Sequence, residues 1–329
     1  MRSLLLTGVA AGLFGCATFT VAEARFGQEG ELESFVQDMA NRHDFDTTEL
    51  RQLLDQAEPR QDIIDAMKNP AERLPWHRYR PIFLKPDRIA QGVAFWNDNS
   101  ELLEKISTEY GVPPEILVAI VGVETYYGRH KGRHRVLDAL ATLGFNYPPR
   151  AQFFRRELEQ YLLLAREERL DPLQLTGSYA GAMGMPQFIP SSYRSYAVDG
   201  DGDGRRDLFS NTADIMASVA NYFRRHNWET GGLIAAPAQV SGKGWLALND
   251  QDLKPVRTFA QLTAAGVSTT TAAAADAPAR LLVLEAADGD EHWATFHNFY
   301  VITRYNRSPL YAMAVFQLAQ QIKNQRTVR

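Results

Sequence analysis

The sequence predicts a predominantly helical α+β protein. Apolar residues recur three to four positions apart between Gly30 and Ala90, and the same spacing predicts a helix from Arg150 to Arg169. Glycines and β-type runs gather late in the chain, where Arg280 to Leu284 and Phe299 to Thr303 are expected to form strands. The chain has 329 residues, 45% hydrophobic and 22% charged, which is enough for two or three substructures around a sizeable core.

The amino terminus has the pattern of an export signal. Arg2 precedes an apolar stretch from Leu4 to Phe14, which is too short to span a bilayer. Cys16 ends the run Leu-Phe-Gly-Cys, which looks like a lipobox and predicts lipidation of this cysteine. The alternative is cleavage after Ala24, which leaves no lipid. Residues 1–24 are therefore read as a leader region, and no later cysteine could form a disulfide.

The rest of the chain divides into four expected parts. Residues 25–90 form a helical lobe, in which prolines between positions 70 and 86 predict an irregular strap. Residues 91–230 form the main core, residues 231–300 a small inserted β subdomain, and residues 301–329 a helix that returns to the core. The Thr- and Ala-rich tract at 269–277 lacks large apolar side chains, so we expect a mobile loop there.

One carboxylate stands out. Glu124 is the only charged residue between Glu115 and Arg129, and it follows the apolar run from Ile116 to Val123. Desolvation disfavours the ionised form of such a carboxyl group, so Glu124 is a candidate general acid. The alternative is a carboxylate that points to solvent from a helix end.

Four motifs surround this residue in the sequence. They are GVETYYG at 122–128, RVLDALATLGFNYP at 135–148, GSYAGAMGMPQFIPSSY at 177–193 and YVITRYNRSPLYAMAV at 300–315. In order and separation they resemble the lytic murein transglycosylase B family of bacterial cell-wall enzymes, and the resemblance extends over about residues 31–323. It implies a lysozyme-like core with a groove between lobes.

The resemblance also implies the chemistry. A conventional glycosidase needs two carboxyl groups, but Asp138 is expected in an amphipathic helix, and Glu157 and Glu159 on a charged, Arg-rich face. In the family a single acid protonates the β-1,4 link between N-acetylmuramic acid and N-acetylglucosamine. The same residue, here Glu124, then deprotonates the C6 hydroxyl, which closes a 1,6-anhydro ring.

Further positions match the family's substrate-binding residues. Ser178 and Gln187 match a hydroxyl and an amide that hold the muramyl sugar, and the second group of matching positions is Tyr305, Asn306 and Tyr311. Arg150 matches a contact to the peptide stem. Two departures weaken the match: Met185-Pro186 replaces a Tyr-Gly pair of some relatives, and Pro149 stands where some have another arginine.

A second strong motif begins at Asp199. Asp199, Asp201, Asp203 and Asp207 occupy positions 1, 3, 5 and 9 of an EF-hand-like loop, with Gly204 at position 6 and Arg205 at position 7. This pattern predicts a structural Ca²⁺ site, and the alternative is a solvated Asp-Gly turn. Position 12 is Ser210 and not a bidentate glutamate, so weak binding is expected. His130 and His134 are four positions apart, but the cations around them argue against a metal pair.

Net charge limits the kinds of molecule that the chain is expected to bind. The charge of −4 and the pI near 6.0 provide no basic field for nucleic acid, and a neutral or mixed-charge polymer is easier to accommodate. The resemblance implies that the partner is the peptidoglycan glycan strand, and we expect a monomer without an organic cofactor. We expect export to the periplasm, as an outer-membrane lipoprotein in preference to a soluble enzyme. The alternative functions are a muramidase-type hydrolase and a catalytically idle peptidoglycan-binding lipoprotein. Retention of Glu124 with Ser178 and Gln187 argues against the idle protein.

Overall fold

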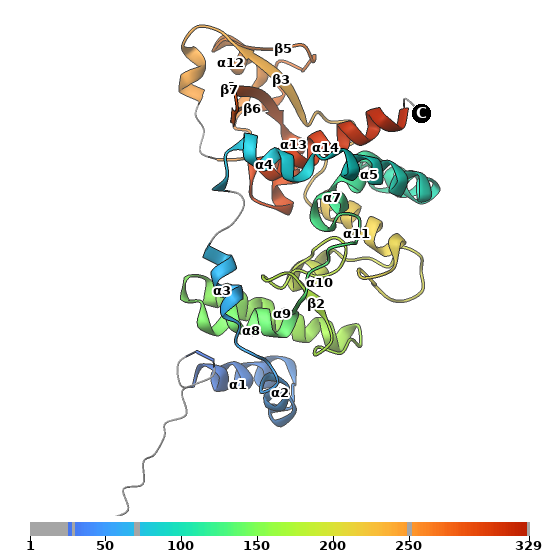
Figure 1. Cartoon of the computed structure of the whole chain (residues 1–329), viewed down its shortest axis with the longest axis vertical. Coiled ribbons are helices and arrows are strands. Elements are labelled where there is room, and N and C mark those ends of the chain that lie inside the picture. Colours follow the sequence, from blue (N-terminus) through green and yellow to red (C-terminus); the bar gives the residue numbers. More distant parts are fainter. Residues whose placement is uncertain (1–25, 28–29, 69–72, 249–251, 328–329) are drawn as a thin grey trace, which may run out of the picture.

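The computed structural model describes residues 26–27, 30–68, 73–248 and 252–327, and helices dominate it (Figure 1). The helices of the amino-terminal half are α1 (Glu31–His43), α2 (Thr47–Leu54), α3 (Gln61–Lys68), α4 (Trp76–Phe83), α5 (Pro86–Asp98), α6 (Ser100–Tyr110), α7 (Pro114–Thr125), α8 (Val136–Asn146) and α9 (Ala151–Glu167). Later helices are α10 (Pro190–Tyr196), α11 (Thr212–Arg225), α12 (Phe259–Ala264), α13 (His297–Tyr305) and α14 (Pro309–Thr327). Short 3₁₀ turns lie at Pro148–Arg150 and Gly244–Leu248.

The strands form two antiparallel sheets. The short strands β1 (His134–Arg135) and β2 (Thr176–Gly177) pair with each other. The larger sheet has the order β4-β6-β7-β3-β5, formed by β3 (Ala235–Val240), β4 (Arg257–Thr258), β5 (Val267–Thr269), β6 (Pro278–Ala286) and β7 (Gly289–Phe296). Figure 1 shows this sheet at one end of the molecule and α1 and α2 at the other.

Helix α7 lies at the centre of the main core. Gly111 ends α6 in the left-handed conformation with a φ of 73°, and Pro114 begins α7, where its missing amide hydrogen is not needed. The helix is apolar on all sides, so it must be covered on all sides. The carboxy-terminal helix α14 packs along it, together with α5, α6 and α11. Lys323 of α14 donates a 2.7 Å hydrogen bond to Glu115, which ties the far end of α14 to the start of α7.

The expected irregular strap is wrong for the described part of that segment. Helix α4 forms there, beginning directly after Pro75 and containing Pro81. A proline inside so short a helix removes a single hydrogen bond, whereas the helix buries the side chains of Trp76 and Tyr79 almost completely. Burial of the two rings therefore outweighs the proline.

The strand expected at Phe299 to Thr303 is also wrong, because these residues lie in α13. A short apolar run that is buried on all sides does not distinguish a strand from a helix. Besides the short β4, β6 pairs with the more polar β7, from Ala279 opposite Phe296 to the turn at Gly289. Gly289 adopts a φ of 120°, a conformation that favours glycine.

A second, smaller core supports the predicted β subdomain. Its members are Ala236, Leu248, Leu262, Val267, Ala279, Leu281, Ala294 and Phe296, which come from the larger sheet and the segments beside it. The predicted domain boundaries stay predictions. The predominantly helical α+β fold class is confirmed.

The leader region lies outside the described residues, and with it Cys16 and Ala24. Within the described part of the chain, no single helix is long and apolar enough to cross a membrane. Only α6 and α7 taken together reach that length and composition, and they are bent by 111°.

Candidate active site

Glu124 occupies the last turn of α7. Every other residue from Glu115 to Thr125 is buried, whereas Glu124 is half-buried. The helix therefore carries one carboxylate out of the core to a partly solvated position. Tyr311 of α14 donates a 2.5 Å hydrogen bond from its hydroxyl to Oε1 of Glu124. The candidate acid is thus positioned by a hydroxyl group from a distant part of the sequence.

The chain leaves α7 through two residues in the left-handed region. Tyr126 has a φ of 52° and Tyr127 a φ of 58°, which is costly for residues with a Cβ atom. Contacts hold the turn: Tyr127 donates a 2.9 Å hydrogen bond to the carbonyl oxygen of Arg88, and Gln91 donates one of 2.8 Å to the hydroxyl of Tyr126. Glycine at position 122 leaves room for the Tyr127 ring, since a Cβ there would lie 2.7 Å from its hydroxyl oxygen. This packing fixes the backbone that follows Glu124.

Tyr305 and Tyr311 form an aromatic pair beside Glu124. Their rings are nearly parallel, at an interplanar angle of 10° with centroids 6.4 Å apart. Burial raises the pKa of both hydroxyl groups well above the usual value, and the nearby charge of Glu124 adds to the effect. Both groups therefore remain hydrogen-bond donors over the physiological pH range. Asn306 follows Tyr305 directly, half-buried at the end of α13.

The glycine-rich loop is held against both of these elements. Thr125 donates a 2.9 Å hydrogen bond to the carbonyl oxygen of Met185, and Tyr305 donates one of 2.6 Å to the carbonyl oxygen of Pro186. Met185 and Pro186 depart from the pattern of some relatives. In the structure, their carbonyl oxygens accept the hydrogen bonds that join the loop to α7 and α13. Sequence reasoning missed Thr125, and the Thr-Tyr-Tyr-Gly run after Glu124 was the available signal.

Within this loop, Ser178 and Gln187 are ordered by backbone contacts. The Ser178 Oγ accepts hydrogen bonds from the amides of Ala180 and Ala182, at 3.2 and 3.0 Å. Gln187 has a φ of 51°, and its side-chain amide donates to the carbonyl oxygens of Lys131 and Gly184, at 3.1 and 3.0 Å. The structure therefore brings Glu124, Tyr305, Tyr311 and the Ser178–Gln187 loop together.

Arg150 lies apart, at the start of α9. Its side chain is exposed, and its guanidinium group packs 4.3 Å from the ring centre of Phe153 and 5.1 Å from that of Phe154.

The acids rejected as a second catalytic group are occupied elsewhere. Asp138 is buried and bonded to Arg135 at 2.7 and 2.8 Å. Glu157 was expected on a charged, Arg-rich face, but its side chain is buried. Its carboxylate accepts hydrogen bonds of 2.9 and 2.8 Å from the amide and hydroxyl of Ser191, and burial raises its pKa. Glu159 bonds to Arg42 and His43 on a partly exposed face.

The acidic loop gathers three of its four expected acidic ligands. Carboxylate oxygens of Asp199, Asp201 and Asp203 lie within 4.8 Å of one another, and all three residues are exposed. The carboxylate of Asp207 is not part of this cluster and accepts hydrogen bonds from the amides of Phe209 and Ser210, at 2.7 and 3.0 Å. The three clustered acids have the spacing and chemistry that a hard cation such as Ca²⁺ requires.

Asp214 is a further acid that the sequence reasoning missed. It is fully buried beneath the loop, and its carboxylate accepts 2.7 Å hydrogen bonds from the amides of Gly200 and Asp207. Burial raises the pKa of this group. Its position near the start of α11, after the loop, was the available signal.

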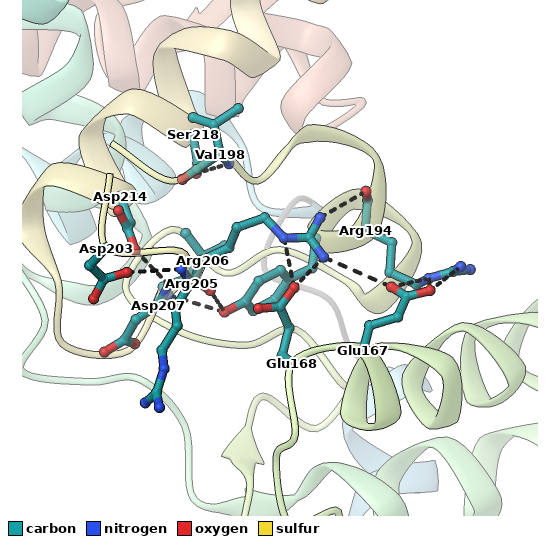
Figure 2. A network of polar contacts seen from close by, with 12 residues as sticks. Glu167, Glu168, Arg194, Val198, Asp203, Arg205, Arg206, Asp207, Asp214 and Ser218 are labelled. Atoms are coloured by element: carbon teal, nitrogen blue, oxygen red, sulfur yellow. Dashed lines mark hydrogen bonds and ion pairs between the residues drawn. The ribbon is translucent and has the colours of Figure 1, made fainter. Parts of the chain in front are cut away.

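Ion pairs also join the acidic loop to the end of α9 (Figure 2). The guanidinium group of Arg206 lies between Glu167 and Glu168 and forms ion pairs with both. The side chain of Arg205 points away from these acids in the same view. If Arg205 binds a cation in the way that its loop position predicts, its backbone carbonyl oxygen is the ligand.

Comparison with known proteins decides the family. The model of the family described as "Transglycosylase SLT domain" matches residues 27–320. Membrane-bound lytic murein transglycosylase B of Escherichia coli (strain K12) is 43% identical over 307 residues, which cover 90% of this chain and 84% of that protein. The chain belongs to the lytic murein transglycosylase B family.

Solved structures agree with this membership. The lytic transglycosylase SltB1 of Pseudomonas aeruginosa, solved in a catenated form, is 47% identical with a TM-score of 0.86, and the match covers 91% of this chain and 99% of that one. Escherichia coli lytic transglycosylase Slt35 in complex with calcium is 42% identical with a TM-score of 0.82, covering 92% and 97%. The complex of Pseudomonas aeruginosa SltB3 with NAG-NAM-pentapeptide is 29% identical with a TM-score of 0.79, covering 88% and 78%.

These findings confirm the family, the lysozyme-like fold and the enzyme class expected from the sequence, a peptidoglycan lytic transglycosylase.

Proposed function

We propose that this lytic transglycosylase cleaves the β-1,4 bond between N-acetylmuramic acid and N-acetylglucosamine with Glu124 as its single acid and base. The observation that carries the proposal is the Glu124 carboxylate, half-buried at the end of a buried helix and bonded to Tyr311 at 2.5 Å. Such a position suits a group that must hold a proton in one step and release it in the next. Asp138 and Glu157 are buried in hydrogen bonds of their own, so neither supports a mechanism with two carboxyl groups.

The proton follows a closed path. Glu124 gives its proton to the glycosidic oxygen as the bond to C1 of the muramyl sugar breaks, and positive charge develops on C1 and the ring oxygen. The C6 hydroxyl oxygen of the same sugar then bonds to C1, and its proton returns to Glu124. No water is consumed, so the product carries a 1,6-anhydro end. The hydrogen bond from Tyr311 stabilises the carboxylate during the interval in which it lacks its proton.

The remaining site residues hold the substrate. Ser178 and Gln187 bind the muramyl sugar and its N-acetyl group, and Tyr305 and Asn306 line the groove beside Glu124. These roles are supported by the hydrogen bonds that hold the glycine-rich loop against α7 and α13. Arg150 contacts the carboxylates of the peptide stem, a role that its exposed guanidinium group can fulfil. The peptide-containing ligand bound to the related SltB3 supports a substrate of this kind.

The acidic loop holds a structural Ca²⁺ ion. Asp199, Asp201 and Asp203 supply carboxylate oxygens, and Arg205 supplies its backbone carbonyl oxygen. The calcium complex of the related Slt35 supports this assignment. Asp207 joins the site if its side chain turns from Ser210, and the lack of a glutamate at position 12 keeps the affinity low. The ion would hold the loop in one conformation and would not take part in bond cleavage.

The protein is exported to the periplasm and acts there as a monomer on glycan strands. Lipidation of Cys16 would anchor it in the outer membrane, and the name of the Escherichia coli relative, which includes "membrane-bound", supports this. Cleavage after Ala24 would instead release a soluble enzyme. The mass of the mature amino terminus distinguishes the two.

Mass spectrometry of the muropeptides released from purified peptidoglycan tests the mechanism. The expected products are lighter by one water than their reducing counterparts. Replacing Glu124 with glutamine keeps the shape of the side chain but removes the proton, so release should slow by about 10²- to 10⁴-fold while binding to insoluble peptidoglycan persists. Reducing ends would establish a muramidase-type hydrolase. No release by the wild-type protein would establish a peptidoglycan-binding lipoprotein, and turnover by the variant would remove Glu124 from the mechanism.

A further inference from the structure

Two adjoining cavities lie where α4 and α14 meet the β6–β7 hairpin. One has a volume of about 670 Å³ and lies under the tip of the hairpin, and the other has about 570 Å³ and lies along β7 and α14. They share Arg80, Asp290, Glu291 and Gln321, so together they form one continuous cleft. Figure 1 shows α4 and α14 crossing at this side of the larger sheet. Among the described residues, none that lines the cleft belongs to the group around Glu124.

Four polar atoms in the walls of the cleft have no hydrogen-bond partner within the described residues. They are Nε1 of Trp76, Nδ1 of His77, Nε2 of His292 and Oε1 of Gln317. Trp76 and Gln317 are 1% and 9% exposed. Buried polar groups in folded proteins are almost always paired, so four unpaired groups around one cleft point to a ligand that offers both donors and acceptors.

An aromatic surface lies in the same cleft. Trp293 is half-buried and stands edge-to-face with Phe316, with ring centroids 6.2 Å apart, and its indole nitrogen donates a 3.3 Å hydrogen bond to Glu291. These contacts fix the indole ring in one orientation. Side-chain amides of α14 line the same cavity, from Gln317, Gln320, Gln321 and Asn324. A rigid aromatic ring among amides suits a ligand with apolar C–H faces and polar edges.

The charges in the cleft disfavour an anion. Asp288, Asp290 and Glu291 contribute three carboxylates, against the single guanidinium group of Arg80. Arg80 lies 3.6 Å from Glu291, which partly neutralises one of them. The remaining negative charge repels the carboxylates of a peptide stem and phosphate groups alike. An anionic ligand is therefore disfavoured, whereas an uncharged one avoids this repulsion.

We propose that this cleft binds an uncharged chain of β-1,4-linked N-acetylated amino sugars. The side chains of Trp76, His77, His292 and Gln317 turn toward the bound sugar, so that their unsatisfied atoms pair with its hydroxyl and acetamido groups. A pyranose face packs on Trp293. The cleft holds a glycan segment without cleaving it, so the proposal stands or falls independently of the chemistry at Glu124.

Isothermal titration of the full chain with tetra-N-acetylchitotetraose tests this proposal. The wild-type protein is expected to show two sites, because the groove at Glu124 binds the same sugars. Gln321 is exposed and lines both cavities, so Gln321→Trp fills the cleft without disturbing the core. This variant should lose one site and still release soluble muropeptides at the wild-type rate. Gln325→Trp, one turn further along α14 and lining neither cavity, is the matched control and should keep both sites.

A second variant tests the unpaired atoms directly. Gln317→Leu removes the buried amide, so sugar affinity at this site should fall at least tenfold while the melting temperature stays the same or rises, as expected when an unsatisfied polar group is removed. The same number of sites in Gln321→Trp as in the wild-type protein would overturn the proposal, whatever the groove at Glu124 binds. Unchanged affinity in Gln317→Leu would do the same. Muropeptide release is measured separately, so failure of this proposal is distinguishable from failure of the catalytic one.

Discussion

Replacing Gly122 with alanine would place a methyl group against the ring of Tyr127. The added Cβ would lie 2.7 Å from the hydroxyl oxygen, 2.8 Å from Cζ and 2.9 Å from Cε1 of Tyr127. The ring can move away only by lengthening its 2.9 Å hydrogen bond to the carbonyl oxygen of Arg88. Because Tyr127 fixes the turn after Glu124, the substitution acts on both stability and activity.

Three effects determine the change in the free energy of unfolding. Alanine is better than glycine in a helix by about 1 kcal/mol. Overpacking costs about 1–3 kcal/mol, and a lost neutral hydrogen bond about 0.5–1.5 kcal/mol. The net expectation is a loss of stability of about 0.5–3.5 kcal/mol. In a Tyr127→Leu background the clash and the hydrogen bond are both absent, so the same substitution should stabilise by up to about 1 kcal/mol.

Urea unfolding, followed by circular dichroism, is measured for the wild type, Gly122→Ala, Tyr127→Leu and the double variant. The effect of Gly122→Ala on the free energy of unfolding should change sign between the two backgrounds. The midpoint of unfolding should fall in Gly122→Ala and rise when the substitution is made in Tyr127→Leu, with an unchanged slope. Release of muropeptides by Gly122→Ala should slow as well, since the turn that positions Glu124 is displaced. Equal destabilisation of both backgrounds would refute the assignment of the cost to Tyr127.

Three further perturbations follow from the site. Tyr311→Phe removes a hydrogen bond to a charged carboxylate, worth about 1.5–3 kcal/mol, so muropeptide release should slow about ten- to hundredfold, and an unchanged rate would exclude this role. Asp201→Asn should abolish the rise in melting temperature that millimolar Ca²⁺ produces in chelator-treated protein, and a wild type insensitive to Ca²⁺ would contradict the site. Burial raises the pKa of Glu157, so its contribution to stability is complete below about pH 4 and is lost as the pH rises. The melting temperature of Glu157→Gln relative to that of the wild type should therefore be higher at pH 8 than at pH 4. A difference that does not change with pH would show that Glu157 does not titrate.

Sequence patterns located the residues whose neighbours are close in the chain. Glu124 stood out because one charge follows eight apolar residues, and the acidic loop because its spacing matches a ligand geometry. The hydrogen bond from Tyr311 to Glu124 joins residues 187 positions apart, and Tyr311 was identified only through the resemblance to the family. The contacts of Thr125 with Met185 and of Tyr305 with Pro186 depend in the same way on tertiary packing.

Glu157 shows how a local pattern can mislead. Arg155 and Arg156 precede it, which suggested a charged, Arg-rich face. Successive helical residues point about 100° apart, however, and Glu157 lies on the same face as the buried Phe154 and Tyr161. Its carboxylate reaches Ser191 from inside the core. Helical period, applied residue by residue, would have placed it correctly.

The hydrogen bond between Tyr311 and Glu124 also sets the time at which activity can appear. A ribosome that adds roughly 5–20 residues per second makes Glu124 about 10 to 40 seconds before Tyr311. Throughout that interval the growing chain has the acid without the hydroxyl group that positions it, and α7 lacks the helix that covers it. The site therefore reaches its final geometry only when nearly the whole chain has been made.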